Sequence, residues 1–252
     1  MVRECIMGRK MTTTVSSATY ETKLQERVEI AHKTIAFSFE KPAGFSFRPG
    51  QFVDISLMTA DDTNQNIAFS LASSPHQVRL TIATRMRNTP FKQQFAALAL
   101  NSTIKMEGPL GNFVLATDVN RPAVFIAGGI GVTPFRSMII DAIHRQLPLE
   151  MFLFYSNRRP EDAALFSEFE RLSNLHSNFH FVPTMTNLVD SKAGWSGETG
   201  HIDNKLLSKY ISVSSPLFYI AGAPRMVNAI RHMLCKMKVG EKDIRSEDFV
   251  GY

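Results

Sequence analysis

The chain has 252 residues, of which 44% are hydrophobic and 20% charged, and a formal net charge of +5 at pH 7. This is the composition of a globular protein with room for two ordinary domains, which excludes a disordered or collagen-like chain. The only two cysteines, Cys5 and Cys235, stand far apart. They exclude a disulfide framework, a four-thiolate zinc site and a cysteine-ligated iron–sulfur cluster.

The sequence also bears on where the protein is located and on which partners it binds. No segment has the ~18 consecutive apolar residues that a membrane-spanning helix needs, and no apolar signal core precedes residue 22. We therefore expect a soluble cytoplasmic protein without a membrane span. The basic residues are spread evenly, which argues against nucleic-acid binding and mildly favours acidic partners. His176 and His180 lack a nearby carboxylate motif, so we expect no metal site.

After an N-terminal tail of residues 1–21, residues 22–118 are predicted to form an antiparallel β-barrel. Apolar and polar residues alternate in several short segments, which Gly- and Pro-containing turns separate. One helix is predicted at Thr89–Leu100, and many short strands with one helix are typical of a small barrel. The predicted strands are Lys23–Phe39, Phe52–Leu57, Val78–Thr84 and Ser102–Met106.

Residues 119–252 are predicted to form a Rossmann-like α/β domain. Short apolar strands alternate here with helical segments, which implies a parallel sheet covered by helices. The predicted strands are Ala123–Ala127, Leu149–Tyr155, Phe179–Val182 and Leu217–Ala221. The predicted helices are Pro134–Gln146, Pro160–Leu175, His201–Tyr210 and Ala223–Val239. The fold class is therefore two-domain, with the barrel first and the α/β domain second.

The clearest motif joins the first strand of the second domain to its first helix, where a glycine-rich loop ends in Thr133 and Pro134. Glycines let the backbone approach phosphate oxygens, Thr133 is predicted to cap the helix, and Pro134 suits its first turn. Free N–H groups and the helix dipole then face an anion. Although Pro134 replaces the third glycine of GxGxxG, the strand–loop–helix context favours a dinucleotide over a mere tight turn. The candidate residues are Gly128, Gly129, Gly131, Val132, Thr133 and Pro134.

The second strand of this domain ends in Ser156, Arg158 and Arg159. A loop that prefers NAD usually carries an acidic residue near this position for the ribose hydroxyls, whereas arginine suits a 2′-phosphate. The sequence therefore favours NADP(H) over NAD(H) and leaves NAD(H) open. The alternative is that both arginines are merely solvated.

Five stretches in this order and spacing resemble the ferredoxin–NADP(H) reductase superfamily, from about residue 22 to the end of the chain. They are Phe47–Val53, Phe69–Pro75, Gly108–Phe113, Gly128–Pro134 and Phe218–Pro224. The resemblance implies that the barrel binds FAD and that the α/β domain binds NAD(P)H. It also implies that hydride passes from NAD(P)H to the flavin and that electrons then leave to an acceptor.

The resemblance also implies flavin-binding residues in the barrel. Phe69 and Ser70 match the aromatic and hydroxyl positions of the family's Arg-x-Tyr-Ser motif. Ile67 stands at the arginine position and Phe69 at the tyrosine position, so one phosphate-binding charge and one phenol hydroxyl are missing. Arg85 and Arg87 lie where the resemblance implies the family's second phosphate-contacting stretch, and Arg87 is our candidate replacement for the missing charge. The alternative is that both arginines are ordinary surface residues. The cofactor-binding residues implied beyond the glycine loop and the second strand are Phe69, Ser70, Leu71, Ala83, Thr84, Arg87, Thr89, Gly222 and Met226.

Two features concern catalysis. Relatives often carry Cys-Gly-Pro after the fourth strand, and this chain has Ala221-Gly222-Ala223-Pro224 without the thiol. Members of the family commonly end with an aromatic residue over the flavin ring, which makes Phe249 and Tyr252 candidates for a movable lid. With Ser70, these are the implied catalytic residues. A frayed terminus is the alternative interpretation of the tail.

The leading function is a FAD-dependent NAD(P)H oxidoreductase, for which an acidic carrier of the ferredoxin or flavodoxin type is the favoured acceptor. Free flavin, a ferric chelate and the partner oxygenase of a multicomponent system stay open as acceptors. The first alternative is an NAD(P)H:free flavin reductase, since the missing contacts at Ile67 and Phe69 would let flavin exchange. The second is a flavin-binding module with little activity. Sequence motifs do not identify the acceptor, because acceptor surfaces are diffuse.

Overall fold

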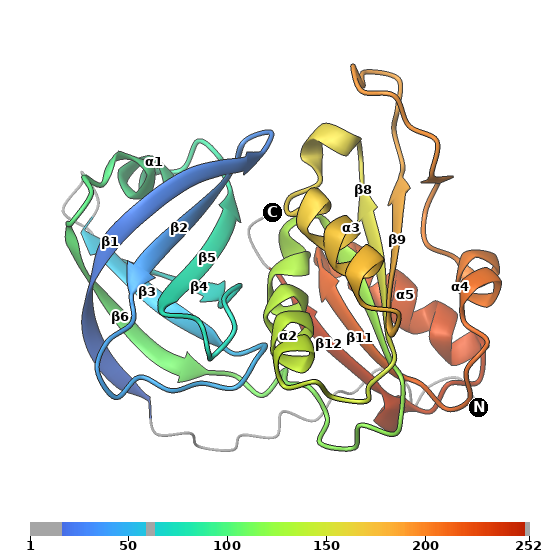
Figure 1. Cartoon of the computed structure of the whole chain (residues 1–252). Coiled ribbons are helices and arrows are strands. Elements are labelled where there is room, and N and C mark those ends of the chain that lie inside the picture. Colours follow the sequence, from blue (N-terminus) through green and yellow to red (C-terminus); the bar gives the residue numbers. More distant parts are fainter. Residues whose placement is uncertain (1–16, 59–63, 250–252) are drawn as a thin grey trace.

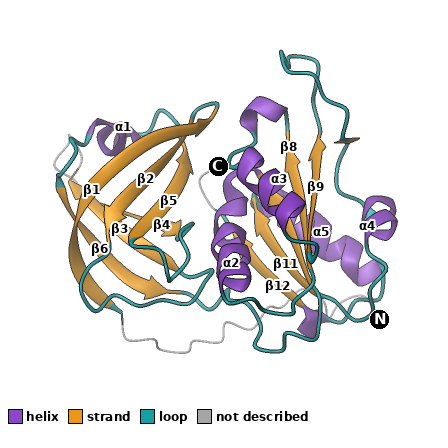
Figure 2. Cartoon of the chain, viewed as in Figure 1, coloured by secondary structure: helices purple, strands orange, loops and turns teal. Residues whose placement is uncertain are grey.

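The computed structural model describes residues 17–58 and 64–249, which form two halves lying side by side (Figure 1). Figure 2 shows that strands dominate the first half, while helices flank the sheet of the second. The predicted fold class, an antiparallel β-barrel followed by a Rossmann-like α/β half, is confirmed.

The barrel is a six-stranded antiparallel sheet in the order β4-β3-β6-β1-β2-β5. A bridge between Leu71 and Ile82 joins its two edges just beyond β4. Fully buried Phe37, Phe39 and Phe95 fill the interior, and Phe95 comes from the helix α1. The elements are β1 Ala18–Ala31, β2 Thr34–Glu40, β3 Phe52–Met58, β4 Asn64–Ser70, β5 Arg79–Arg85, α1 Pro90–Ala97 and β6 Thr103–Leu110.

The second half is a six-stranded parallel sheet in the order β10-β9-β8-β7-β11-β12. Helices α2 and α3 pack on one face and α4 and α5 on the other. The strands are β7 Ala123–Gly128, β8 Met151–Asn157, β9 Phe179–Met185, β10 Glu198–Thr199, β11 Leu217–Gly222 and β12 Ile244–Asp248. The helices are α2 Thr133–His144, α3 Phe166–Leu175, α4 Asn204–Tyr210 and α5 Pro224–Lys236.

The structure corrects several predicted elements. The segment Lys23–Phe39 is two strands of a hairpin, and β1 begins at Ala18, inside the expected tail. The expected helix Pro160–Leu175 is interrupted, because Leu165 adopts a left-handed backbone with φ of 62° between a 3-10 turn and α3. Three strands were not predicted: β4, β10 and β12.

Helix α2 holds the two halves together. Ser137 donates a hydrogen bond of 2.6 Å from Oγ to the carbonyl oxygen of Ser73, and Arg136 donates one of 2.7 Å from Nη1 to the carbonyl oxygen of Ala72. Arg136 also forms a bidentate ion pair with Glu168 of α3. The loop after β4 is therefore fixed against the start of α2, which brings the barrel and the glycine loop to one place.

Two further properties bear on function. Among the described residues, no helix is both long enough and apolar enough to cross a membrane. Within the same ranges, no group of three or more His, Cys, Asp or Glu side chains is arranged to hold a metal ion.

Candidate functional site

A cavity of about 610 Å³ opens where the barrel meets the α/β half. The barrel contributes β4, β5 and the start of α1, and the other half contributes the start of α2 and the end of β12. The lining residues are Phe52, Gln65, Asn66, Ile67, Ala68, Phe69, Ser70, Ala83, Thr84, Arg85, Arg87, Thr89, Phe91, Lys92, Ile130, Thr133, Glu247, Asp248 and Phe249.

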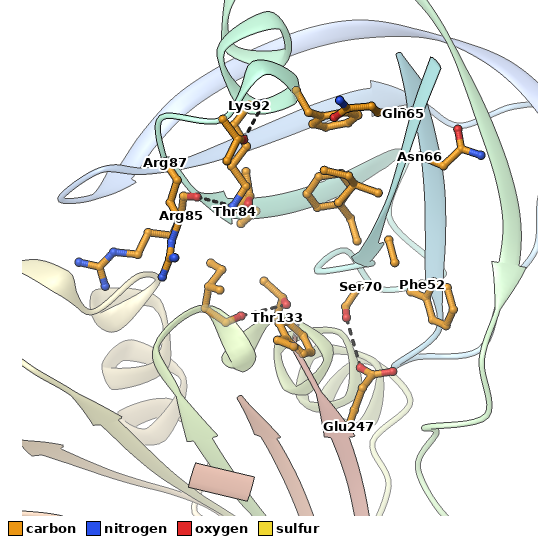
Figure 3. A pocket seen from close by; sticks show the side chains of 18 of the residues that line it. Phe52, Gln65, Asn66, Ser70, Thr84, Arg85, Arg87, Lys92, Thr133 and Glu247 are labelled. Carbon is orange, nitrogen blue, oxygen red and sulfur yellow. Dashed lines mark hydrogen bonds between the residues drawn. The ribbon is translucent and has the colours of Figure 1, made fainter. Parts of the chain in front are cut away.

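A serine and a carboxyl group from opposite halves meet inside this cavity. Ser70 Oγ donates a hydrogen bond of 3.3 Å to Glu247 Oε2, as Figure 3 shows. Burial raises the pKa of Glu247 to about 7, and the hydrogen bond from Ser70 opposes this rise without cancelling it. The Glu247 residue is partly exposed, but its carboxyl end lies where water is scarce. It can therefore hold or release a proton near neutral pH.

The opposite side of the cavity carries positive charge (Figure 3). Arg85, Arg87 and Lys92 line it, next to the N-terminus of α1. Thr89 caps this helix, and its Oγ1 accepts a hydrogen bond of 3.4 Å from the amide of Lys92. Burial, and then the charge of Arg87, lower the pKa of Lys92. A bound anion would stabilise the charged form of Lys92, which burial and Arg87 disfavour. This end of the cavity therefore suits a phosphate group.

The rest of the wall is largely apolar. Phe69 is 6% exposed, and its ring stacks on Phe95 of the barrel core with centroids 5.6 Å apart. Ile67, Ala83 and Phe249 complete the apolar surface. An apolar wall, a cationic end beside a helix N-terminus and a titratable carboxyl group together fit FAD, which combines an aromatic ring system with a pyrophosphate.

The glycine loop lies at the carboxyl end of β7, next to the cavity, and begins with a 3-10 turn at Gly129–Val132. A Cβ atom at Gly131 would lie 2.4 Å from the carbonyl oxygen of Ala221, so glycine is required for close packing on β11. The predicted capping role of Thr133 is wrong. Thr133 is already helical, and its Oγ1 donates instead to the carbonyl oxygen of Ile130 at 3.1 Å. Pro134 does lie in the first turn of α2.

Residues at the ends of neighbouring strands surround this loop. Ser156 of β8 pairs with Gly128. The sulfur of Met226 packs against both Gly128 and Gly222, since a Cβ at either glycine would meet it within 3.3 Å. Gly222 has a backbone φ of 154°, a conformation that residues other than glycine rarely adopt.

The two arginines after β8 differ. Arg158 is exposed, and no ion pair joins it within the described part of the chain. Arg159 forms an ion pair with Asp162, at 3.1 Å from Nε to Oδ2. Only Arg158 therefore presents its guanidinium to solvent without an internal carboxylate partner.

The predicted site residues fall into two groups. Those that line the cavity are Phe69, Ser70, Ala83, Thr84, Arg87, Thr89, Thr133 and Phe249. Those that gather around the carboxyl ends of β7, β8 and β11 are Gly128, Gly129, Gly131, Val132, Pro134, Ser156, Arg158, Arg159, Gly222 and Met226. Leu71 belongs to neither, because its side chain is fully buried in the barrel core. Tyr252 lies outside the described residues.

Sequence reasoning did not single out Glu247 and Lys92. Glu247 stands at the end of a short polar strand that only its pairing with β11 reveals. Lys92 was detectable, because it follows Thr89, at the start of the predicted helix, by three residues.

Comparisons with known proteins match both halves. The family model of the oxidoreductase FAD-binding domain matches residues 21–115, and that of the oxidoreductase NAD-binding domain matches residues 125–232. The chain is similar to reductase component 2 of terephthalate 1,2-dioxygenase from Comamonas sp., with 25% identity over 81% of this chain and 59% of that protein. It is also similar to the NAD(P)H-flavin reductase of Aliivibrio fischeri, with 26% identity over 79% of this chain and 84% of that protein.

Among solved structures, the fold matches a ferredoxin NADP+ reductase from Neisseria gonorrhoeae with bound FAD and NADP. The TM-score is 0.79, with 22% identity, and the match covers 91% of this chain and 98% of that one. The chain spans about three fifths of the length of several curated relatives that it matches. The chain is thus built from an FAD-binding and a NAD-binding domain of oxidoreductases.

Proposed function

We propose, because the chain belongs to the ferredoxin–NADP(H) reductase superfamily, that it oxidises NAD(P)H through bound FAD and passes the electrons to a separate acceptor. The observation that carries this proposal is the cavity between the halves, where the Ser70–Glu247 hydrogen bond, the cationic start of α1 and the glycine loop converge. When bound there, the flavin supplies the hydride-accepting and electron-releasing chemistry.

The chain's own residues position the reactants. Ile67, Phe69 and Phe249 would flank the ring system, while Arg87, Lys92 and the amides at the start of α1 would hold the pyrophosphate. Glu247 would hold or release a proton in the cavity, because its pKa is close to neutral. Removal of bulk water from the cavity walls would strengthen each of these contacts.

Phe249 is the proposed lid. Its backbone amide donates a hydrogen bond of 2.9 Å to the carbonyl oxygen of Gly222, so the segment is anchored while the ring borders the cavity. If the ring must move before nicotinamide can stack, Phe249→Ala will lower the KM for NADPH and for NADH together. Steady-state kinetics of the wild type and of Phe249→Ala with each nucleotide check this, and unchanged KM values contradict the lid.

Several finer points are proposals of the same kind. We place the nucleotide preference with NADP(H), since the exposed Arg158 suits a 2′-phosphate. The acceptor would be an acidic electron carrier or the oxygenase of a multicomponent system, as the names of relatives suggest. The net charge of +5 supports an acidic partner. The use of NAD(P)H as substrate supports a cytoplasmic location. The domain boundary that we propose between residues 118 and 119 can be tested by limited proteolysis.

The first experiment is an absorbance spectrum of the purified protein, followed by anaerobic titration with NADPH and then NADH. We expect bound yellow flavin that NADPH bleaches before NADH does. Flavin that is bound but reduced by neither nucleotide overturns the proposal and leaves a flavin-binding module.

A second candidate, an NAD(P)H:free flavin reductase, rests on Ile67. This residue lines the cavity where the family's motif has arginine, so one charge-assisted contact to the flavin phosphates is missing. A lost contact of this kind weakens binding by about one to two decades. A colourless protein that reduces only added flavin would favour this candidate.

A further inference from the structure

A single carboxylate joins the two candidate binding sites. Asp162 ends the 3-10 turn after β8, and its side chain is 2% exposed. Arg85 of the barrel donates a hydrogen bond of 3.0 Å from Nη2 to Asp162 Oδ1. Arg159 donates two, of 3.1 Å from Nε to Oδ2 and 3.2 Å from Nη2 to Oδ1. One negative charge is thus shared by two positive charges, one from each half of the molecule.

The geometry of Arg159 matters for ligand binding. Nε and Nη2 form the edge of the guanidinium that grips a carboxylate or a phosphate with two parallel hydrogen bonds. In this chain Asp162 already occupies that edge. A 2′-phosphate near the end of β8 must therefore compete with Asp162 for Arg159.

Arg85 influences the same competition from the flavin cavity. Its side chain lines that cavity (Figure 3), while its guanidinium draws on the same oxygen of Asp162 that Nη2 of Arg159 uses. Burial opposes ionisation of Asp162, but the hydrogen bond from Arg159 and the charge of Arg85 outweigh it, so the pKa of Asp162 is lowered. Asp162 is therefore ionised at neutral pH, and it is divided between its two partners.

We propose that Asp162 determines how strongly this chain discriminates between 2′-phosphorylated and unphosphorylated adenine nucleotides, by withholding Arg159 from the 2′-phosphate. Arg85 acts as a positioning residue that weakens this hold from the flavin side. The inference deepens the proposed function and rests on its nucleotide site. A ligand in the flavin cavity that attracts Arg85 would break the hydrogen bond between Arg85 and Asp162. Asp162 would then bind Arg159 more tightly, and by linkage the affinity for the 2′-phosphate would fall.

The test measures binding, independently of turnover. The flavin-loaded protein is titrated by calorimetry with adenosine 2′,5′-bisphosphate and with 5′-AMP, and the ratio of the two Kd values gives the discrimination. Asp162→Asn should raise the discrimination about tenfold, because it frees one charge-assisted contact. Arg85→Gln should lower the discrimination, because Asp162 then forms hydrogen bonds with Arg159 and no longer with Arg85. Arg79→Gln is the matched control on the same strand, where Arg79 pairs with Glu26 on the exposed surface.

A double variant checks the route of the effect. In Asp162→Asn combined with Arg159→Ala, the gain should disappear, since no released guanidinium remains. An unchanged or lower discrimination in Asp162→Asn overturns the inference. If that variant does not fold, Arg85→Gln decides, and an unchanged ratio there overturns the inference equally. A wild-type protein that binds neither nucleotide overturns the nucleotide site of the proposed function itself, and the inference with it.

Discussion

Glu247 contributes to the pH dependence of the stability of this protein. The pKa of Glu247 is about 7 in the folded protein, against 4.5 for an ordinary glutamate, the value expected in the unfolded chain. Folding therefore favours the protonated form. The stabilisation is complete below pH 4.5 and is lost as the pH rises through 7. At 1.36 kcal/mol per pKa unit, the loss amounts to about 3 kcal/mol.

Glu247→Gln should remove this loss, because glutamine stays neutral. Denaturant unfolding of wild type and variant at pH 5 and pH 8 measures the effect, and we expect the variant to gain relative stability at the higher pH. Asp248→Asn, which changes the exposed neighbouring carboxylate, is the control. Parallel stability curves for Glu247→Gln and wild type would contradict the buried carboxyl group.

Arg87 is the residue that we expect to replace the missing arginine at Ile67. It lines the flavin cavity and lies close enough to Lys92 to lower the pKa of that amine. Arg87→Ala should weaken FAD binding tenfold to a hundredfold, the value of about 1.5–3 kcal/mol for one charge-assisted contact. Fluorescence titration of the apoprotein with FAD measures this. Arg79→Ala serves as control, and equal affinity in both variants refutes the replacement.

At the level of the elements, the glycine loop is held by contact with its neighbouring strand. A Cβ atom at Gly131 would meet three backbone atoms of Ala221 and Gly222 within 2.8 Å, and backbone cannot swing aside. Gly131→Ala should therefore cost about 1–3 kcal/mol of stability and lift the loop from β11. Thermal unfolding and nucleotide titration report the two effects. Gly194→Ala is the control, since a Cβ there meets nothing within 4 Å.

Local patterns explain which elements were predictable. The strand β7, the glycines and the start of α2 carry their signal within a dozen adjacent residues, so the sequence alone locates the nucleotide loop. The strand β12 does not, because its polar residues alternate weakly and only pairing with β11 makes it a strand. Glu247 comes to the cavity through that pairing, which is why the Ser70–Glu247 contact was missed.

The interruption before α3 has a similar origin. The segment Pro160–Leu175 has helical character throughout, but Leu165 turns into a left-handed conformation and separates Asp162 from the helix. This places the carboxylate against Arg85 of the barrel, 77 residues away in sequence. Contacts over such distances depend on the packing of both halves, and no local pattern encodes them.

Across the whole molecule, Arg136 connects three elements. Its guanidinium pairs with Glu168 of α3 and donates to the carbonyl oxygen of Ala72 in the barrel, with 13% of its side chain exposed. Arg136→Leu should lower stability by about 1.5–3 kcal/mol and separate the unfolding of the two halves into distinct calorimetric transitions. On the same helix, Arg145 pairs with Asp141 but is 59% exposed. Arg145→Leu should therefore cost less than about 1 kcal/mol, and equal losses would contradict the role of Arg136.

Two of the hydrogen bonds between α2 and the barrel are chemically one-sided, unlike the contacts of Ser74 with Asp141 and of His76 with His144. The α/β half contributes the side chains of Arg136 and Ser137, whereas the barrel contributes the backbone carbonyl oxygens of Ala72 and Ser73. Every residue type carries that carbonyl group, so these bonds depend on the path of the barrel turn and not on its side chains. Recombination could therefore join this α/β half to the barrel of a distant relative with the same turn. These two bonds would then form without any compensating substitution in the barrel turn.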